Sequence, residues 1–186
     1  MNDEDGSTLA PLGLIICRAT VSDAAIIARH RVEMFRDMGQ VPADELATTL
    51  LEESTSALAV WLADGSYVGW LARDAHQVVA GVGAHIKPQL PRITHDATRV
   101  AASSVPLVVN VYTEPPWRRR GIARALMNTV LQWSTAQGFD RVVLHASETG
   151  RPLYASLGFV ATNEMRWWPR AIVPSDAPVD APLDAE

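Results

Sequence analysis

An arginine-rich turn stands between an apolar run and a segment with helical periodicity in the second half of the chain. It reads Trp117-Arg118-Arg119-Arg120-Gly121-Ile122-Ala123 and follows the apolar residues 107–113. A strand, a tight turn and a helix start present backbone N–H groups to an anion, and the helix dipole adds to the attraction. Three successive arginines are unfavourable at the positive end of that dipole unless an anion offsets their charge. We therefore expect a phosphorylated ligand here rather than a solvated patch.

Individual residues of this turn suit that ligand. Gly121 can adopt backbone angles denied to other residues, and Ala123 leaves room where a larger side chain would block a phosphate. Arginines 118, 119, 120 and 124 can supply charge-assisted hydrogen bonds. A Walker P-loop requires Gly-x4-Gly-Lys-Ser/Thr and a dinucleotide fingerprint requires Gly-x-Gly-x-x-Gly, and neither pattern occurs at this turn. The turn is therefore of another phosphate-binding kind.

Two motifs resemble those of the GCN5-related N-acetyltransferases. Arg118-x-x-Gly121-x-Ala123 matches the Gln/Arg-x-x-Gly-x-Gly/Ala motif of that family. Downstream, Leu153-Tyr154-Ala155-Ser156-Leu157-Gly158-Phe159 is similar to the family's Leu-Tyr-x-x-x-Gly-Phe segment. The motifs occur in the family's order, separated by a helix and a strand, and the resemblance covers the chain from Leu14 to about Trp168.

The resemblance implies that the phosphorylated ligand is acetyl-coenzyme A, with its pyrophosphate on the amides from Arg119 to Arg124. The pantetheine arm would pair with a bulged strand edge near Val111 and Thr113, where one backbone amide would polarise the thioester carbonyl. Ser147 stands where the family usually has a coenzyme-binding asparagine. The expected coenzyme-binding residues are Val111, Thr113, Arg118, Arg119, Arg120, Gly121, Ile122, Ala123, Arg124 and Ser147.

The resemblance also implies candidate catalytic groups. Tyr154 would protonate the coenzyme A thiolate as it leaves, because a phenol is protonated at neutral pH; the alternative is a tyrosine that packs a helix on the sheet. The acceptor amine must lose a proton to attack. Glu114, directly after the fourth expected strand, is the first candidate base, with a solvated turn carboxylate as the alternative. His145 is a weaker candidate.

The acceptor pocket of this fold is expected between the first two helices and the central strands. Residues there include His30 and Gly39, and the candidate acceptor-binding residues are Met34, Phe35, Met38, Trp70, His85 and His145. For each of them, core packing is the alternative. The histidines lack close metal-ligand spacing, so we predict no metal. No combination of these residues identifies the amine.

The elements that must position these residues follow from hydrophobic periodicity and turn residues. Strands are expected at 14–18, 67–73, 77–86, 107–113 and 141–146, with a final hairpin of 159–162 and 164–168. Helices are expected from about 22 to 39, 43–62, 122–133 and 152–157. The order β-α-α-β-β-β-α-β-α-β-β predicts an α/β (α+β) fold, with a mixed, mostly antiparallel central sheet flanked by helices on both faces. Residues 13–171 form one domain, 1–12 are expected to lack structure, and 172–186 form a flexible acidic tail.

Composition narrows the function further. The chain has 186 residues, a formal net charge of −5 and one cysteine, Cys17, which we expect to be a buried small hydrophobe. The acidic total disfavours nucleic acid and anionic membranes as partners, and an acidic start with no apolar run long enough to span a bilayer predicts a cytoplasmic protein. We expect an acyl-coenzyme A-dependent N-acyltransferase, and the family resemblance makes a homodimer the oligomer to test. The alternatives are a non-catalytic acyl-coenzyme A sensor and, less favoured, a nucleic-acid binder.

Overall fold

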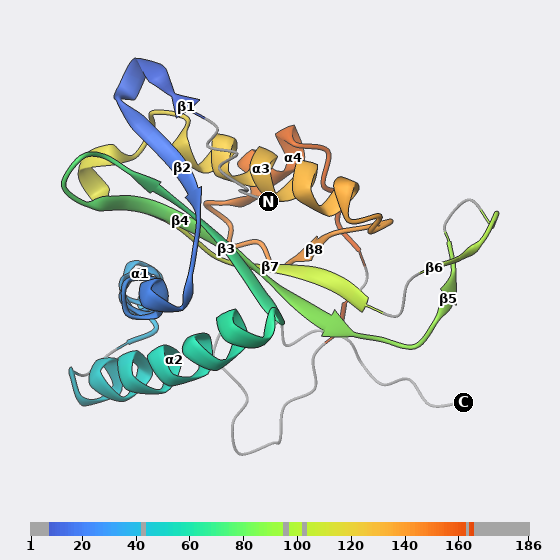
Figure 1. The fold of residues 1–186 in the computed structure, drawn as a ribbon, viewed down its shortest axis with the longest axis horizontal. Helices are drawn as coiled ribbons and strands as arrows, with labels where there is room; N and C mark the ends of the chain where they lie inside the picture. Colours follow the sequence, from blue (N-terminus) through green and yellow to red (C-terminus); the bar gives the residue numbers. More distant parts are fainter. Residues whose placement is uncertain (1–7, 42–43, 95–96, 102–103, 163, 166–186) are drawn as a thin grey trace, which may run out of the picture.

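Six strands form one twisted sheet with helices on both sides (Figure 1). The computed structural model describes residues 8–41, 44–94, 97–101, 104–162 and 164–165. The spatial order is β1-β2-β3-β4-β7-β8, with antiparallel neighbours except the parallel pair β7 and β8. Their bounds are β1 Thr8–Leu9, β2 Leu14–Arg18, β3 Tyr67–Arg73, β4 Val78–Pro88, β7 Ser104–Thr113 and β8 Val143–Leu144. The mixed, mostly antiparallel sheet predicted from the sequence is confirmed.

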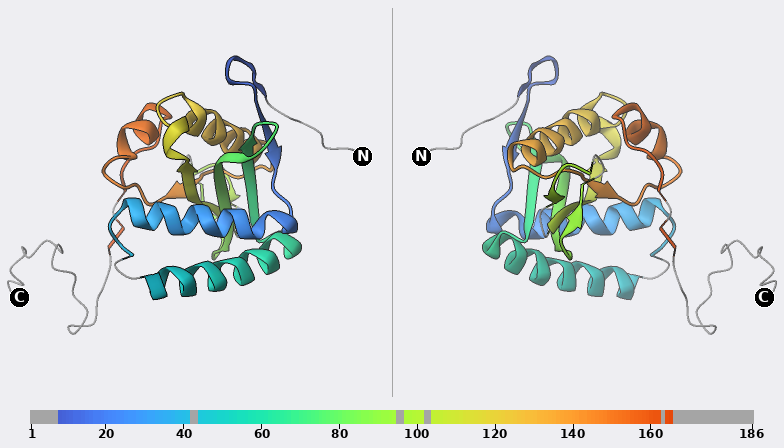
Figure 2. Two further views of the ribbon diagram at one scale, coloured as in Figure 1. Left: turned by 90° about the vertical axis from the view of Figure 1, so that its left-hand side faces the viewer. Right: turned by 90° about the vertical axis from the view of Figure 1, so that its right-hand side faces the viewer.

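Helices cover the two faces of the sheet in pairs (Figure 2). On one side lie α1 (Ala24–Asp37) and α2 (Asp44–Asp64), and on the other lie α3 (Ile122–Ala136) and α4 (Arg151–Ser156). Two hydrophobic clusters result. One packs the apolar face of α3, including Leu126 and Met127, against Val82 and its neighbours in the sheet. The other packs Ile27 and Leu58 of α1 and α2 against Tyr67 and Leu71 of β3. Burial of these helix faces follows the 3.6-residue periodicity of the sequence.

Strand β7 is irregular at Asn110, and this irregularity shapes the site. Gly81 pairs with Tyr112 but Gly83 pairs with Val109, so two residues of β7 lie opposite Val82. Asn110 has φ +56°, which an asparagine tolerates better than a branched residue. This is the bulge expected from the family resemblance. Near the bulge, β7 and β8 separate, because β8 pairs with Leu107 and Val108 only. The edge of β7 that faces β8 therefore has no strand partner from Val109 onward among the described residues.

Several expected elements differ in the structure. Residues 8–12 are ordered, contrary to the prediction for 1–12, because β1 pairs with Leu14 and Ile15 across a turn at Gly13 and is followed by η1 (Ala10–Leu12). The loop expected after the third strand contains a short hairpin of β5 (Arg92–Ile93) and β6 (Val100–Ala101), held to the body by an ion pair from Arg92 to Asp140. The strand expected at 141–146 is limited to β8. No residue of 159–162 or 164–165 is in a strand; the rest of that expected hairpin and the 172–186 tail lie outside the described residues.

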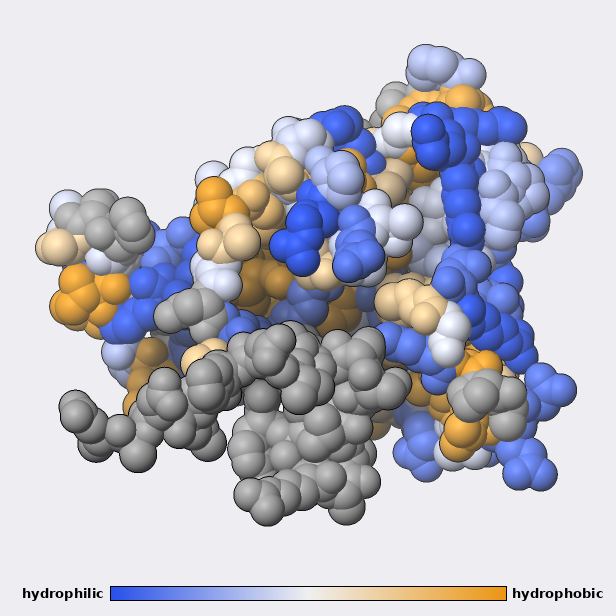
Figure 3. Space-filling view, turned by 180° about the vertical axis from the view of Figure 1, so that it is seen from behind, coloured by the Kyte–Doolittle hydropathy of each residue, from blue (hydrophilic) through white to orange (hydrophobic). Residues whose placement is uncertain are grey.

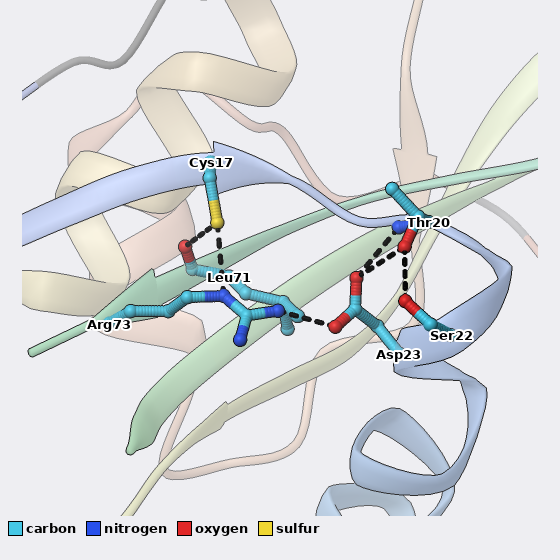
Figure 4. A network of polar contacts seen from close by, with 6 residues as sticks. All are labelled: Cys17, Thr20, Ser22, Asp23, Leu71 and Arg73. Carbon is cyan, nitrogen blue, oxygen red and sulfur yellow. Dashed lines mark hydrogen bonds and ion pairs between the residues drawn. The ribbon is translucent and has the colours of Figure 1, made fainter. Parts of the chain in front are cut away.

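A polar network joins the start of α1 to the sheet (Figure 4). The Arg73 guanidinium donates from Nε to Cys17 Sγ at 3.1 Å and forms an ion pair with Asp23. Asp23 also accepts the Thr20 N–H at 2.8 Å, in the short helix η2 (Val21–Asp23) that leads into α1. Burial alone would raise the pKa of Asp23, but these hydrogen bonds outweigh it and hold that pKa below the usual value. Cys17 is thus half-buried with polar partners, not the purely apolar core residue that we expected.

No helix in the described ranges combines the length and the apolar character needed to cross a membrane. Seen from behind, the molecule carries hydrophilic side chains over much of its surface, around a central hollow with apolar residues in its depth (Figure 3).

Candidate active site

A cavity of about 490 Å³ opens between the end of β7, the start of α3 and α4. We call it the donor cavity. The short helix η3 (Pro115–Trp117) and the arginine turn form one wall, and α4 forms the other. The lining residues are Thr113, Trp117, Arg118, Arg119, Gly121, Ile122, Ala123, Arg124, Pro152, Leu153 and Ser156. The structure therefore brings seven of the ten expected coenzyme-binding residues to one cavity.

The backbone of the arginine turn is shaped to hold an anion. Arg119 and Gly121 both have left-handed angles, with φ +64° and +80°. Such alternation concentrates successive N–H groups on one side of the chain. The first intrahelical bond of α3 runs from the Ala125 N–H to the Gly121 carbonyl, so the N–H groups of Ile122, Ala123 and Arg124 have no acceptor within the helix. A methyl group added at Gly121 would meet no protein atom within 4 Å, so space for a ligand exists there.

Some of the arginine side chains of the turn are held by contacts with the protein, and Arg119 is exposed. Arg118 is held by the protein: Nε donates to the Thr113 carbonyl at 2.8 Å, and the guanidinium pairs with Asp37 at the end of α1. Arg124 donates to Ser156 Oγ at 2.8 Å, which ties α3 to α4 across the cavity. Arg120 lies over the Trp117 ring at 5.3 Å. Arg119 is exposed at the cavity wall. The cluster is thus partly a clamp that fixes the turn.

Tyr154 on α4 lies just behind the donor cavity and is not part of its lining. A methyl group at Gly150 would come within 2.9 Å of Tyr154 Cε2, so this glycine makes room for the ring. The ring packs edge-on against Phe159 at 6.0 Å and adjoins the α3 core. Burial raises the pKa of Tyr154, which keeps the phenol protonated at neutral pH. Ser147 Oγ accepts the Gly150 N–H at 3.2 Å and so supports the start of α4.

Glu114 follows β7 and lies against α1. It forms an ion pair with Arg29, and the same carboxylate oxygen lies 3.3 Å from His30 Nε2. His30 is buried beside the Tyr112 ring, with centroids 5.0 Å apart. Burial, aided by Arg29 and opposed by Glu114, lowers the pKa of His30 to about 4, so its imidazole is neutral at pH 7. The Glu114 carboxylate is therefore held by the Arg29 ion pair and lies next to a neutral imidazole.

A second cavity, of about 440 Å³, lies on the other side of the β7 bulge, between the sheet and α1 and α2. We call it the acceptor-side cavity. Asn110 and Val109 of β7 border it, whereas Val108 and Val111 pack with the α3 core. The lining residues are Arg31, Leu50, Glu53, Ser54, Ala57, Leu58, Trp61, Tyr67, His85, Lys87, Leu107, Val109 and Asn110. The two cavities meet neighbouring stretches of one strand: Asn110 lies three residues from Thr113, about 10 Å along β7.

Comparison with known proteins identifies the family. A family model described as the acetyltransferase (GNAT) family matches residues 32–159. The chain belongs to this family. A GCN5-related N-acetyltransferase from Ralstonia eutropha JMP134 is 32% identical with TM-score 0.74, over 86% of this chain and 99% of that one. A protein from Clostridium acetobutylicum described as a predicted acetyltransferase and solved with acetyl-CoA has TM-score 0.72 and 24% identity, over 84% of this chain and 96% of that one.

Human N-acetyltransferase 8 is a relative by sequence, 28% identical over 119 residues, which are 62% of this chain and 48% of the human protein. This GNAT chain thus spans about half the length of that relative. Aminoglycoside N(6')-acetyltransferase type 1 of Stenotrophomonas maltophilia is 28% identical over 124 residues, or 66% of this chain and 69% of that one. The resemblance read from two short motifs is therefore confirmed as membership of the GNAT family.

The expected acceptor-binding residues are dispersed in this GNAT chain. Only His85 among them lines the acceptor-side cavity, where its ring packs against Trp61 with the ring centroids 4.4 Å apart and the planes tilted by 35°. Trp70 is instead a core residue, 6% exposed and packed on Trp133, because its position in β3 faces α3. His145 lies beyond β8 and pairs with Glu164 at 2.9 Å. Phe35 is outside the lining, but its ring lies against the Arg31 guanidinium. Met34 on α1 and Met38, which caps that helix, are also outside the lining.

Sequence reasoning missed Arg31, Tyr67 and Asn110. Asn110 gave a usable signal, since a polar residue inside the apolar run 107–112 must be explained. Tyr67 is 2% exposed, and burial raises its pKa to about 12. Its hydroxyl makes no hydrogen bond of ordinary geometry to a described residue, although the Asn110 side chain offsets part of that pKa rise. Arg31 gave no signal, because nothing in the spacing of α1 distinguishes it from Arg29 or Arg36.

Proposed function

We propose that this chain transfers an acetyl group from acetyl-CoA to an amine. The observation that carries the proposal is the arginine turn, where two left-handed residues and three unpaired helix amides face an open cavity beside the diverging strands. A pyrophosphate suits such a cradle, because N–H groups at a helix start bind anions. The acetyl-CoA in the Clostridium structure and the names of the relatives support the same ligand.

The residues have distinct tasks in this proposal. The amides from Arg119 to Arg124 hold the pyrophosphate, and the Arg119 side chain adds charge at the cavity wall. The free edge of β7 beyond Val109 offers backbone groups to the pantetheine amides, as a sheet edge does for an added strand. The amide of Val111, the second residue of the bulge, polarises the carbonyl that is to be attacked. Bound acetyl-CoA supplies the activated thioester.

Two side chains are proposed to move protons. Tyr154 keeps its proton at neutral pH and donates it to the leaving sulfur. Glu114 lies on the α1 side of the sheet, the side of the acceptor-side cavity, and takes the amine proton through water. Because Arg29 and His30 both contact one oxygen of Glu114, the second carboxylate oxygen is the one available for this task.

Two measurements on the purified chain test the proposal. Isothermal titration calorimetry should show acetyl-CoA binding, and desulfo-coenzyme analogues that keep the pyrophosphate should bind as well. A thiol-release assay over amines, amino acids, polyamines, aminoglycosides and peptides should then show acetyl transfer to some of them. Binding without thiol release from any acceptor would favour the acyl-CoA sensor. Absence of binding would refute the donor site altogether.

A further inference from the structure

Arg31 is a half-buried cation on the wall of the acceptor-side cavity whose recorded contacts are with neutral groups. Its Nη1 donates to Asn110 Oδ1 at 2.8 Å, and its guanidinium lies 4.8 Å from the centre of the Phe35 ring. None of the ion pairs in the described part of the chain includes Arg31. A guanidinium has five N–H donors and stays charged in proteins, so removing it from water without an anion is costly. This arginine is therefore prepared for an anionic group.

The other charges of this cavity point the same way. Lys87 at the end of β4 is a second cation in the lining, and exposed Glu53 on α2 is the one carboxylate there among the described residues. The described lining thus carries one net positive charge, because Arg31 and Lys87 together outnumber Glu53. An acceptor with several ammonium groups, such as a polyamine or an amino sugar, would meet repulsion. An acceptor with a carboxylate would be attracted.

Much of the remaining lining of the cavity is apolar. Leu50, Leu58 and Trp61 on α2 face Val109 on β7 across it, and Trp61 stacks on His85. A volume of about 440 Å³ suits a small molecule at the lower end of ordinary ligand pockets. Such a wall binds an aliphatic or aromatic group rather than a second charge.

We propose that the acceptor is a free α-amino acid with an apolar or aromatic side chain, whose carboxylate binds Arg31. This inference rests on the proposed function. Since Arg31 already contacts Asn110 at the bulge, a carboxylate on its guanidinium places an α-amine beside Val111, where the thioester is expected. The amine nitrogen forms the new amide bond as the C–S bond breaks. The amine proton passes through water to Glu114, and the released sulfur receives the proton of Tyr154.

Matched acceptors test the inference in the unmodified chain. L-phenylalanine, its amide and phenethylamine share the amine and the ring but differ at the carboxylate. We expect kcat/KM for phenylalanine to exceed that for the other two by roughly 10- to 100-fold, the range for one hydrogen-bonded charge. Phenethylamine acetylated as well as phenylalanine would overturn the inference and leave the proposed acetyl transfer intact.

An Arg31→Gln variant locates the effect. It should lower kcat/KM for phenylalanine roughly 10- to 100-fold and leave that for phenethylamine unchanged, with acetyl-CoA affinity unaltered. Arg36→Gln is the matched control, since Arg36 lies on the same helix but pairs with Glu33 at the surface. Equal preference in Arg31→Gln and the unmodified chain would refute the assignment. If no acceptor is turned over, phenylalanine and phenethylamine are compared by calorimetry in the presence of coenzyme A, where weaker or equal phenylalanine binding also refutes it.

Discussion

The two ends of α3 offer a controlled test of the anion cradle. Gly121 before the helix has φ +80° and Gly138 after it has φ +76°. A Cβ at either position meets no protein atom within 4 Å, so alanine adds no clash in either place. The cost of each substitution is the left-handed backbone alone, about 1–2 kcal/mol. For a chain of this size that lowers Tm by roughly 2–8 °C.

Coenzyme affinity should separate the two variants. Gly121 lines the donor cavity, whereas Gly138 lies at the far end of the helix, 15 residues of α3 away. The methyl group of Gly121→Ala enters the space beside the helix amides and moves a phosphate off at least one of them. A hydrogen bond to a charged group is worth about 1.5–3 kcal/mol, so acetyl-CoA should bind roughly 10- to 100-fold more weakly. Gly138→Ala should bind it normally.

Calorimetry with acetyl-CoA and thermal unfolding of the free chain measure both effects on the same samples. The expected result is an equal loss of Tm in the two variants and a loss of affinity in Gly121→Ala only. Equal affinities at equal Tm would refute the placement of the pyrophosphate on the Arg119–Arg124 amides. Equal losses of affinity would show that binding merely follows stability.

Three further substitutions test the remaining assignments. Tyr154→Phe should lower kcat by roughly 100-fold, because it removes the proposed acid. The acetyl-CoA Kd should stay within about twofold, because the ring still packs on Phe159. An unchanged kcat would reject Tyr154 as the acid. Glu114→Gln should also lower kcat by about 100-fold, measured by thiol release at saturating acceptor; activity within twofold of the unmodified chain would make Glu114 a structural partner of Arg29. Asp23→Asn should destabilise the fold by about 1–2 kcal/mol in urea unfolding at pH 7, through loss of the Arg73 ion pair and the weakened Thr20 cap. Because the pKa of Asp23 is lowered in the folded state, its contribution to stability is complete above the unfolded pKa near 3.9 and is lost as pH falls below that value. The unmodified chain and Asp23→Asn should therefore converge in stability at acidic pH. A constant difference down to about pH 2 would contradict this account.

The shape of the arginine turn was predictable because the turn is made of consecutive residues. An anion cradle of this kind needs several backbone N–H groups in one turn. The sequence of the seven-residue turn shows both the glycine and the helix that follows, so its shape can be read from consecutive residues. Trp70 shows where such reasoning fails. Alternation along a strand shows that successive side chains lie on opposite faces of the sheet. It does not show which of the two faces packs on α3 until the register with β4 is known.

The side chains of Arg118 and Ser147 show a second limit. Both lie in motif positions, yet Arg118 binds Thr113 and Asp37, and Ser147 supports the Gly150 amide. Side chains at motif positions can therefore hold the shape of a turn through contacts within the protein. In the proposed cradle the backbone N–H groups of the turn are the main donors, and contacts such as those of Arg118 and Ser147 keep the backbone in shape.

The acceptor half was not predictable, because its chemistry depends on residues far apart in sequence. Arg31 and Asn110 are 79 residues apart and meet only because β7 bulges beneath α1. At the bulge, Asn110 turns toward the acceptor-side cavity beside Val109, and Val111 returns to the α3 side, near the donor cavity. The bulge at Asn110 therefore sets which residues of β7 face each side of the sheet. If Asn110 were replaced by valine, the left-handed angle would become unfavourable and Arg31 would lose its amide partner. Because Asn110 and Val111 together lie opposite Val82, the substitution would also disturb the strand edge that we propose receives the coenzyme.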